Sequence, residues 1–446
     1  MKPILRYTPL LLAFNLSLLL LYACSAPERK RENNATGEVS TAATNGCSGT
    51  ENTQLDRFDT LNVLVETSGS MAGFMPTSGS QTNFQRVLDN ILANAEAENA
   101  ATLQLFSAGE NIKTLSLPKF REMLRQGLKE TTASTALPNL IKQVAAKHTG
   151  LGQVSLFVSD FIYAPPKSTD RDYISTDIRR ALQAVKAKGL AVSVYAFQSK
   201  FNGTYYPAGA KSGGSGQPLR NCCETELPFY IWAIGSEAGL NRVNSKLMNN
   251  LSYEIIDLGF TRTDPVYGLM PGAGRGGNWY LLNPQQPTIT IDNTREASSG
   301  EMQFTVGFNT QQLPHQFARQ AYLEENLKLK VNNGSAEISE IRNKSDFESA
   351  GRLSSRDKAL LDCYTYYVTV KVNKLDNRNQ PLTINLQLDQ QLPPWIEEWT
   401  TEDDRRPEES GAKTFALNDI MKGVQNLYVS SQSNWFSLPV TIQKAQ

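Results

Sequence analysis

Strand-like and helix-like segments alternate regularly through residues 57–250. The predicted strands are short apolar runs, and the segments between them carry apolar residues at the three- and four-residue spacing of a helix face. Strands are expected at residues 61–65, 102–106, 153–158, 190–197 and 229–235. This alternation predicts an α/β fold with a doubly wound, mostly parallel sheet that has helices on both faces.

Helix boundaries in this region are marked by individual residues. Asn83 is a candidate cap for the first helix, and Thr135 opens a later one. Gly189 is well placed to end the helix that begins near residue 174. Between the strands at 190–197 and 229–235 lies a glycine-rich excursion, residues 200–227, which is expected to be a surface insertion.

The hydrophobic period changes after about residue 255. Runs at residues 288–291, 302–308, 327–331, 366–372 and 382–388 mostly alternate apolar with polar residues. Such alternation predicts half-buried antiparallel strands, and we expect residues 255–392 to form an all-β, sandwich-like domain. The final part, residues 393–446, contains Trp395 and Trp399 and then a predicted helix expected to pack against one of the domains.

The N-terminal part reads as a targeting segment followed by a tether. Lys2 and Arg6 precede an apolar run, residues 10–21, which is shorter than the roughly 20 residues of a membrane span. The run ends in Leu21-Tyr22-Ala23-Cys24, which resembles the bacterial lipobox. The resemblance implies that residues 1–23 are a lipoprotein signal peptide and that Cys24 is lipidated. The alternative is an ordinary signal peptide with a chance cysteine.

Charge and composition restrict the partners. The chain has 44 basic and 44 acidic residues, so no net field attracts nucleic acid. Loss of Lys2 and Arg6 with the signal would leave a net charge of −2, and membrane attachment would come from the lipid anchor. Residues 24–56 are polar and form a predicted flexible tether. We expect a lipid-anchored protein of the bacterial cell envelope, in the outer membrane, since Ser25 after the lipidated cysteine resembles the common sorting rule that allows delivery there. Whether the body faces the periplasm or the exterior stays open.

Four further cysteines are disulfide candidates in such an oxidising compartment. They are Cys47, Cys222, Cys223 and Cys363. Cys222 and Cys223 are adjacent, and ordinary disulfide geometry disfavours a bond between neighbours. One possibility is that each pairs separately, with Cys47 and Cys363.

Polar residues gather at the carboxyl ends of two predicted strands and at one helix start. Glu66, Ser68 and Ser70 follow the first strand, and Asp160 follows the third. Thr135 precedes a helix. Ligands of open α/β sheets bind at the carboxyl ends of strands, and these oxygen groups suit Mg²⁺ or Mn²⁺. Two histidines in the whole chain argue against a histidine zinc site or a histidine-dependent triad.

The order of these groups resembles the von Willebrand factor A fold and its metal-ion-dependent adhesion site over residues 57–254. By this resemblance Ser68, Ser70 and Thr135 would be hydroxyl ligands, and Asp160 would orient a metal-bound water. Glu66 stands where the family has Asp, and Phe161 stands where it has Gly. Thr131 and Thr132 are alternatives to Thr135.

The resemblance implies that the chain binds a protein partner whose acidic side chain completes the coordination of the metal. A non-enzymatic, lipid-anchored binding protein is therefore the leading hypothesis. Two alternatives remain, a metal-assisted hydrolase that uses the same oxygen cluster and a metal-free structural scaffold of the envelope.

Overall fold

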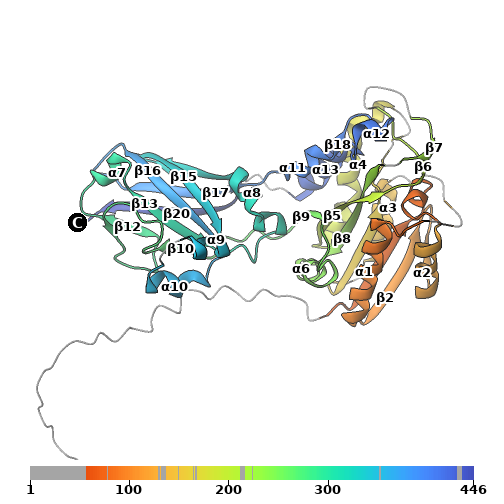
Figure 1. The fold of residues 1–446 in the computed structure, drawn as a ribbon, viewed down its shortest axis with the longest axis horizontal. Coiled ribbons are helices and arrows are strands. Elements are labelled where there is room, and N and C mark those ends of the chain that lie inside the picture. The colour runs from red at the N-terminus through yellow and green to blue at the C-terminus, as the bar shows by residue number, and fades with distance from the viewer. Residues whose placement is uncertain are drawn as a thin grey trace, which may run out of the picture. The chain divides into compact units, whose positions relative to one another are not determined.

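The computed structural model describes residues 57–445 apart from a few internal gaps (Figure 1). The gaps are residues 78, 129–130, 132–136, 149, 164, 166–167, 211–215, 224, 351–352 and 429–433. The predicted signal peptide and tether, with Cys24 and Cys47, lie outside the described residues, as do Thr132 and Thr135. No helix in the described part of the chain is both long and apolar enough to span a bilayer.

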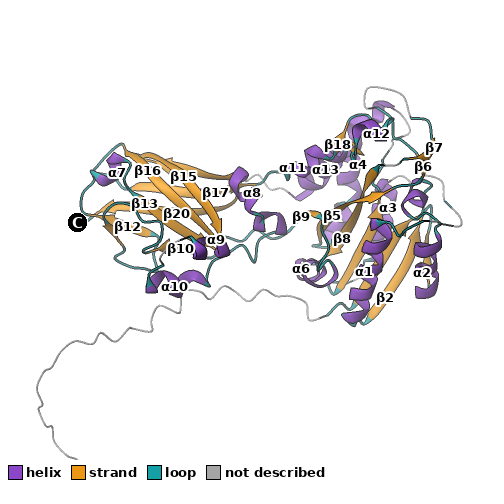
Figure 2. Ribbon diagram, viewed as in Figure 1, coloured by secondary structure: helices purple, strands orange, loops and turns teal. Residues whose placement is uncertain are grey.

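A seven-stranded mixed sheet forms the centre of the first domain (Figure 2). Its strands lie in the order β3-β2-β1-β4-β8-β5-β9 within the described residues. Their bounds are β1 (Thr60–Glu66), β2 (Thr102–Ala108), β3 (Ile112–Leu115), β4 (Gln153–Ser159), β5 (Ala191–Lys200), β8 (Glu226–Gly235) and β9 (Glu254–Leu258). All five strands predicted for this region are present.

The prediction of a mostly parallel sheet is wrong. Strand β1 is parallel to β2 and β4, whereas β8 is antiparallel to both β4 and β5, β9 is antiparallel to β5, and β3 is antiparallel to β2. The reason is the connection from β5 to β8. Its described residues form a short hairpin, β6 (Gly203–Tyr205) and β7 (Leu219–Cys222), and no crossover helix, and the chain returns beside β5 in the opposite direction.

Helices cover both faces of the sheet, as predicted. One face packs on α1 (Asn83–Ala97), α2 (Leu117–Gln126), α6 (Glu237–Arg242) and the π-helical turn η4 (Val243–Leu247). The other packs on α3 (Leu137–Lys147), α4 (Ile174–Ala181) and α5 (Gln183–Ala187). The cap of α1 is Thr82 rather than Asn83, since the Thr82 hydroxyl accepts from Gln85 N and the Gln85 side chain accepts from Thr82 N.

The second core is a pair of sheets that share one hydrophobic cluster. One sheet has the order β10-β13-β16-β15 and the other β11-β12-β20-β17-β14. The bounds are β10 (Tyr267–Met270), β11 (Trp279–Tyr280), β12 (Thr288–Ile291), β13 (Gln303–Phe308), β14 (Leu327–Asn332), β15 (Gly334–Asn343), β16 (Tyr366–Leu375), β17 (Leu382–Asp389) and β20 (Asn434–Lys444). Short helices connect them: α7 (Glu296–Ser299), η5 (His315–Ala318), α8 (Gln320–Asn326), α9 (Lys344–Ser349) and α10 (Ser355–Leu361).

The chain between β17 and β20 returns to the first domain. It forms α11 (Pro394–Glu398), β18 (Thr400–Thr401), α12 (Pro407–Ser410), β19 (Thr414–Phe415) and α13 (Leu417–Tyr428). Trp395, Phe415 and the apolar face of α13 belong to the same buried cluster as α3 and α4. The first core is therefore completed by residues that follow most of the sandwich in sequence.

Candidate functional site

The loop after β1 brings two hydroxyls together. Glu66 ends β1, and Ser70 begins the 3₁₀ turn η2 (Ser70–Phe74). The Ser68 and Ser70 hydroxyl oxygens are 3.2 Å apart. Two backbone bonds fix the loop: Thr67 N donates to Ala108 O at 2.9 Å, and Met71 N donates to Ser68 O at 3.1 Å.

Asp160 reaches the same place from the end of β4. Strands β1 and β4 are parallel and in register, so their carboxyl ends lie side by side. The Ser159 hydroxyl donates to the Glu66 carboxylate, and Asp160 Oδ1 accepts from Ile162 N at 3.1 Å. The structure thus brings Glu66, Ser68, Ser70 and Asp160 together, whereas Thr135 lies outside the described residues.

The turn after Asp160 has the conformation that a glycine would adopt freely. Phe161 has φ of 56°, in the left-handed region, where a non-glycine residue is strained. Its ring is fully buried and stacks on Trp232, with centroids 4.5 Å apart, and it also contacts Tyr230 at 5.7 Å. Aromatic packing therefore holds a turn that backbone preference alone would not favour.

Burial controls the charge of the site. Glu66 and Asp160 are only 7% and 4% exposed. Burial, and then the charge of Asp160, raises the pKa of Glu66 to about 8, although hydroxyls of Ser159 and Ser68 partly counter the shift. The pKa of Asp160 is also raised by burial and by the charge of Asp404, with the Ser70 hydroxyl acting in the opposite direction.

A divalent cation fits this set of oxygens. Among the described residues, Asp160 Oδ2 is buried without a hydrogen-bond partner. A buried carboxylate oxygen with no donor is costly, and a cation or a proton removes that cost. Carboxylates and hydroxyls are the ligands that Mg²⁺ and Mn²⁺ prefer, so Glu66, Ser68, Ser70 and Asp160 are the described residues that could hold one.

The sequence did not indicate how closely the insertion between β5 and β8 lies against this loop. A Cβ placed on Gly69 would come within 2.8 Å of the ring of Tyr206, a residue that is 45% exposed. Asn202 N donates to Gly73 O at 2.8 Å, and a Cβ on Gly203 would lie 2.7 Å from Gly73 Cα. Glycines on both segments thus allow close backbone contact. The sequence alone does not identify these glycines as contact sites, because it does not show that the two segments meet.

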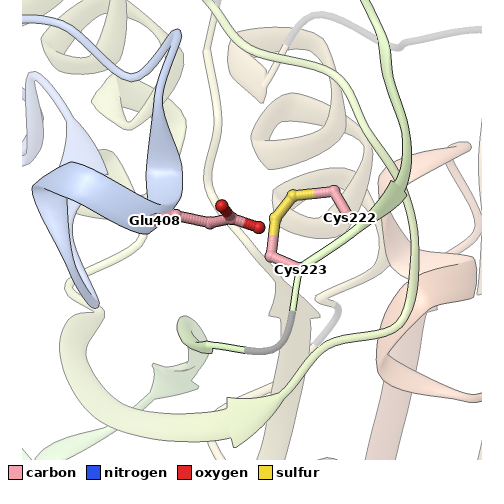
Figure 3. A group of neighbouring side chains, drawn as sticks. All are labelled: Cys222, Cys223 and Glu408. Carbon is pink, nitrogen blue, oxygen red and sulfur yellow. A yellow bond between two sulfur atoms is a disulfide. The ribbon is translucent and has the colours of Figure 1, made fainter.

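The cysteines of the insertion pair with each other. The structure bonds Cys222 to Cys223, whereas separate pairing with Cys47 and Cys363 was one possibility considered from the sequence. The peptide bond between them is cis, and their Cα atoms are 3.1 Å apart. Cys363 is also disulfide-bonded. The Glu408 carboxylate points at the Cys222–Cys223 bond (Figure 3).

Neither histidine is part of the oxygen cluster. His315 Nδ1 lies 2.7 Å from Asp257 Oδ2, and the Ser193 hydroxyl donates to Asp257 Oδ1 at 2.5 Å. Asp257 therefore stands between serine and histidine, and Ser193 is fully buried. This order differs from a catalytic triad, in which the histidine contacts the serine.

Comparison with known proteins gave no match among family models, curated proteins or solved structures. The resemblance to the von Willebrand factor A family therefore stays a prediction.

Proposed function

We propose that this chain is a lipid-anchored protein of the bacterial cell envelope that binds a protein partner through a variant metal-ion-dependent adhesion site of the von Willebrand factor A type. The observation that carries the proposal is Asp160 Oδ2, which is buried beside Glu66, Ser68 and Ser70 and has no hydrogen-bond partner among the described residues. Such an arrangement is favourable when a cation neutralises it.

Each residue has a distinct part in holding Mg²⁺ or Mn²⁺. Ser68 and Ser70 offer neutral hydroxyl oxygens from one tight loop, and Glu66 and Asp160 supply charge from two adjacent strands. Thr135 is proposed as a further hydroxyl ligand. When bound, the cation supplies a Lewis-acidic position that a partner's carboxylate can complete.

A binding function is favoured over hydrolysis by the contacts of the two serines. Their hydroxyls lie against each other, and Glu66 accepts from Ser159. Within the described part of the chain neither histidine contacts Ser68 or Ser70, so the serine–histidine pair of a serine hydrolase is not formed at this site. We propose that the anchor is the lipid on Cys24, delivered by the signal in residues 1–23.

The cation is tested by thermal unfolding. We expect Mg²⁺ at about 100 times its dissociation constant to stabilise the protein by about 2.7 kcal/mol, because it binds the folded state alone. Ser70→Ala removes a ligand from the loop and should abolish most of this shift. The measurement is the melting temperature with Mg²⁺, with Mn²⁺ and with chelator.

The control is Ser335→Ala, which removes an exposed hydroxyl from the sandwich and should leave the shift intact. Identical melting curves with and without both metals would contradict the cation site. The surface around Glu66, Ser68, Ser70 and Asp160 would then have to bind its protein partner without a metal ion.

A further inference from the structure

The candidate site is covered by a distant part of the same chain. A small cavity beside Asp160 is lined by Phe74, Tyr205, Lys413 and Thr414, among others. Lys413 and Thr414 come from the segment that returns after the sandwich. We call residues 399–416 the cap segment.

The cap segment is a closed loop anchored in the core. Strand β18 pairs with β19, so that Thr414 N donates to Trp399 O at 2.8 Å and Ala416 N donates to Thr401 O at 2.9 Å. Phe415 is fully buried, and the Arg171 guanidinium lies 5.5 Å from its ring centroid. The base of the loop is therefore fixed.

Asp404 joins the cap segment to the insertion. It is 1% exposed and accepts hydrogen bonds from Ala208 N at 2.9 Å, Gly209 N at 2.7 Å and the Tyr205 hydroxyl at 3.1 Å. Tyr205 lines the cavity next to Asp160. One carboxylate thus connects the cap segment to the wall of the site.

Two more contacts hold the cap segment, one to strand β8 of the sheet and one to the insertion. The Thr414 hydroxyl lies 2.8 Å from the Tyr230 hydroxyl, which is buried in the sheet. Glu408, in helix α12 of the cap segment, lies against the Cys222–Cys223 disulfide of the insertion, with its carboxylate and both sulfurs within 4.8 Å of one another (Figure 3). The two sulfurs are bonded to each other and are not thiolate ligands.

We infer that the binding partner of the site in this state is the chain's own cap segment, and that a separate protein reaches Glu66, Ser68, Ser70 and Asp160 only by displacing it. This inference rests on the proposed function. Asp404 is close enough for its charge to act on Asp160. A partner that enters the cavity beside Asp160 has to displace Lys413 and Thr414 of the cap segment, which line it.

Asp404→Ala tests the cap segment, with Asp403→Ala as the matched control. Both remove one carboxylate, but Asp403 makes a surface pair with Arg405 and no contact of its side chain to the insertion is found among the described residues. Hydrogen exchange is measured in peptides covering residues 66–74 and 399–416. Tb³⁺ serves as a hard-cation probe, and its luminescence lifetimes in H₂O and D₂O count the waters bound to it.

We expect Asp404→Ala to speed exchange about tenfold or more in both peptides, since buried hydrogen bonds to a charged group are lost. It should also increase the number of waters on Tb³⁺, while Asp403→Ala should match the unsubstituted protein. Faster exchange in 399–416 alone, with 66–74 and the hydration unchanged, would overturn the inference.

Two further results separate the possible failures. If the unsubstituted protein does not bind Tb³⁺, the proposal of a cation site is wrong. Hydrogen exchange in residues 66–74 then still shows whether the cap segment covers the loop after β1. If Asp404→Ala does not fold, Tyr205→Phe removes only one of the three hydrogen bonds and should give a smaller change in the same direction; no change in 66–74 would then count against the cap.

Discussion

Glu66 differs from the aspartate of the family pattern by one methylene, and the structure shows where the extra length goes. The carboxylate extends to the Ser159 hydroxyl, on the neighbouring strand, while it stays close enough to Asp160 for the two charges to interact. Two carboxylates in a buried place disfavour each other's ionised form. The longer side chain thus accepts a hydrogen bond from Ser159, and it is still repelled by the charge of Asp160.

The burial of Glu66, together with the nearby charge of Asp160, predicts an unusual pH dependence of stability when chelator is present. The pKa of Glu66 rises from 4.5 to about 8 on folding, so between these values the folded state holds a proton that the unfolded state has lost. The free energy of unfolding should therefore fall as pH rises from about 4.5 to 8, and level off above. Urea unfolding across this range measures it.

Glu66→Gln should flatten the profile, because glutamine keeps the size and cannot ionise. Glu337→Gln, an exposed change on β15, should leave the profile as it is. Equal slopes for the protein and its Glu66→Gln variant would show that Glu66 is not the group that titrates.

At the residue scale, the sequence predicted which carboxylates lie close together where two neighbouring strands end side by side. Glu66 and Asp160 could be placed together because each directly follows a recognisable buried strand, and those strands are in fact adjacent and parallel. Asp404 could not be found in this way. It is 338 positions from Glu66 in the numbering, in a charged run that resembles an ordinary solvated loop. Only the folded chain shows that this carboxylate is buried.

At the scale of elements, turn η2 can pack closely against the insertion because residue 73 is a glycine and has no side chain. A Cβ on Gly73 would lie 2.3 to 2.7 Å from three atoms of the Phe201 ring. That ring is buried and packs edge-on against Phe74 at 5.1 Å, so it has little room to move. The glycine is what lets the turn carrying Ser70 approach the insertion.

Gly73→Ala is therefore expected to destabilise the protein by about 1–3 kcal/mol through overpacking, and to reduce the Mg²⁺ shift because Ser70 begins the same turn. Gly150→Ala is the matched control, since a Cβ there meets nothing within 4 Å. Chemical denaturation with and without Mg²⁺ measures both effects. A stable Gly73→Ala variant with a full Mg²⁺ shift would contradict the tight fit.

Hydrophobic periodicity predicted the strands well but not their directions. The apolar run that became β8 has the same pattern whether it runs parallel or antiparallel, because both of its faces are buried. Strands β15 and β20 were missed for other reasons. β15 is rich in charged residues at a sheet edge, and β20 follows a helix that belongs to the other core.

At the scale of the whole molecule, the sandwich is inserted into the first domain. The first core includes β9, which ends at Leu258, and resumes with Trp395. The chain leaves and returns at neighbouring points, since Gly259 and Gln391 line one cavity. A cut after β9 therefore does not separate two domains.

Two shortened variants test this arrangement. Residues 57–254 alone lack Phe415, α13 and all of β9 except its first residue. They should be insoluble or molten, because the apolar surface of α4 is left uncovered. Residues 57–259 joined by a short glycine linker to 391–428 restore that cover and should unfold cooperatively in urea. A cooperative transition for 57–254 would show that the returning segment is dispensable for the first core.

The position of β20 also sets an order of events during synthesis. This strand lies between β12 and β17, inside its sheet, and its residues are 434–444. Neither sheet neighbour can complete its hydrogen bonds until the ribosome has added those residues, and the first core must likewise wait for α13. Chain emergence is N-terminal first, and pairing across such long separations is slow. Neither core is therefore complete until α13 and then β20 have been added to the chain.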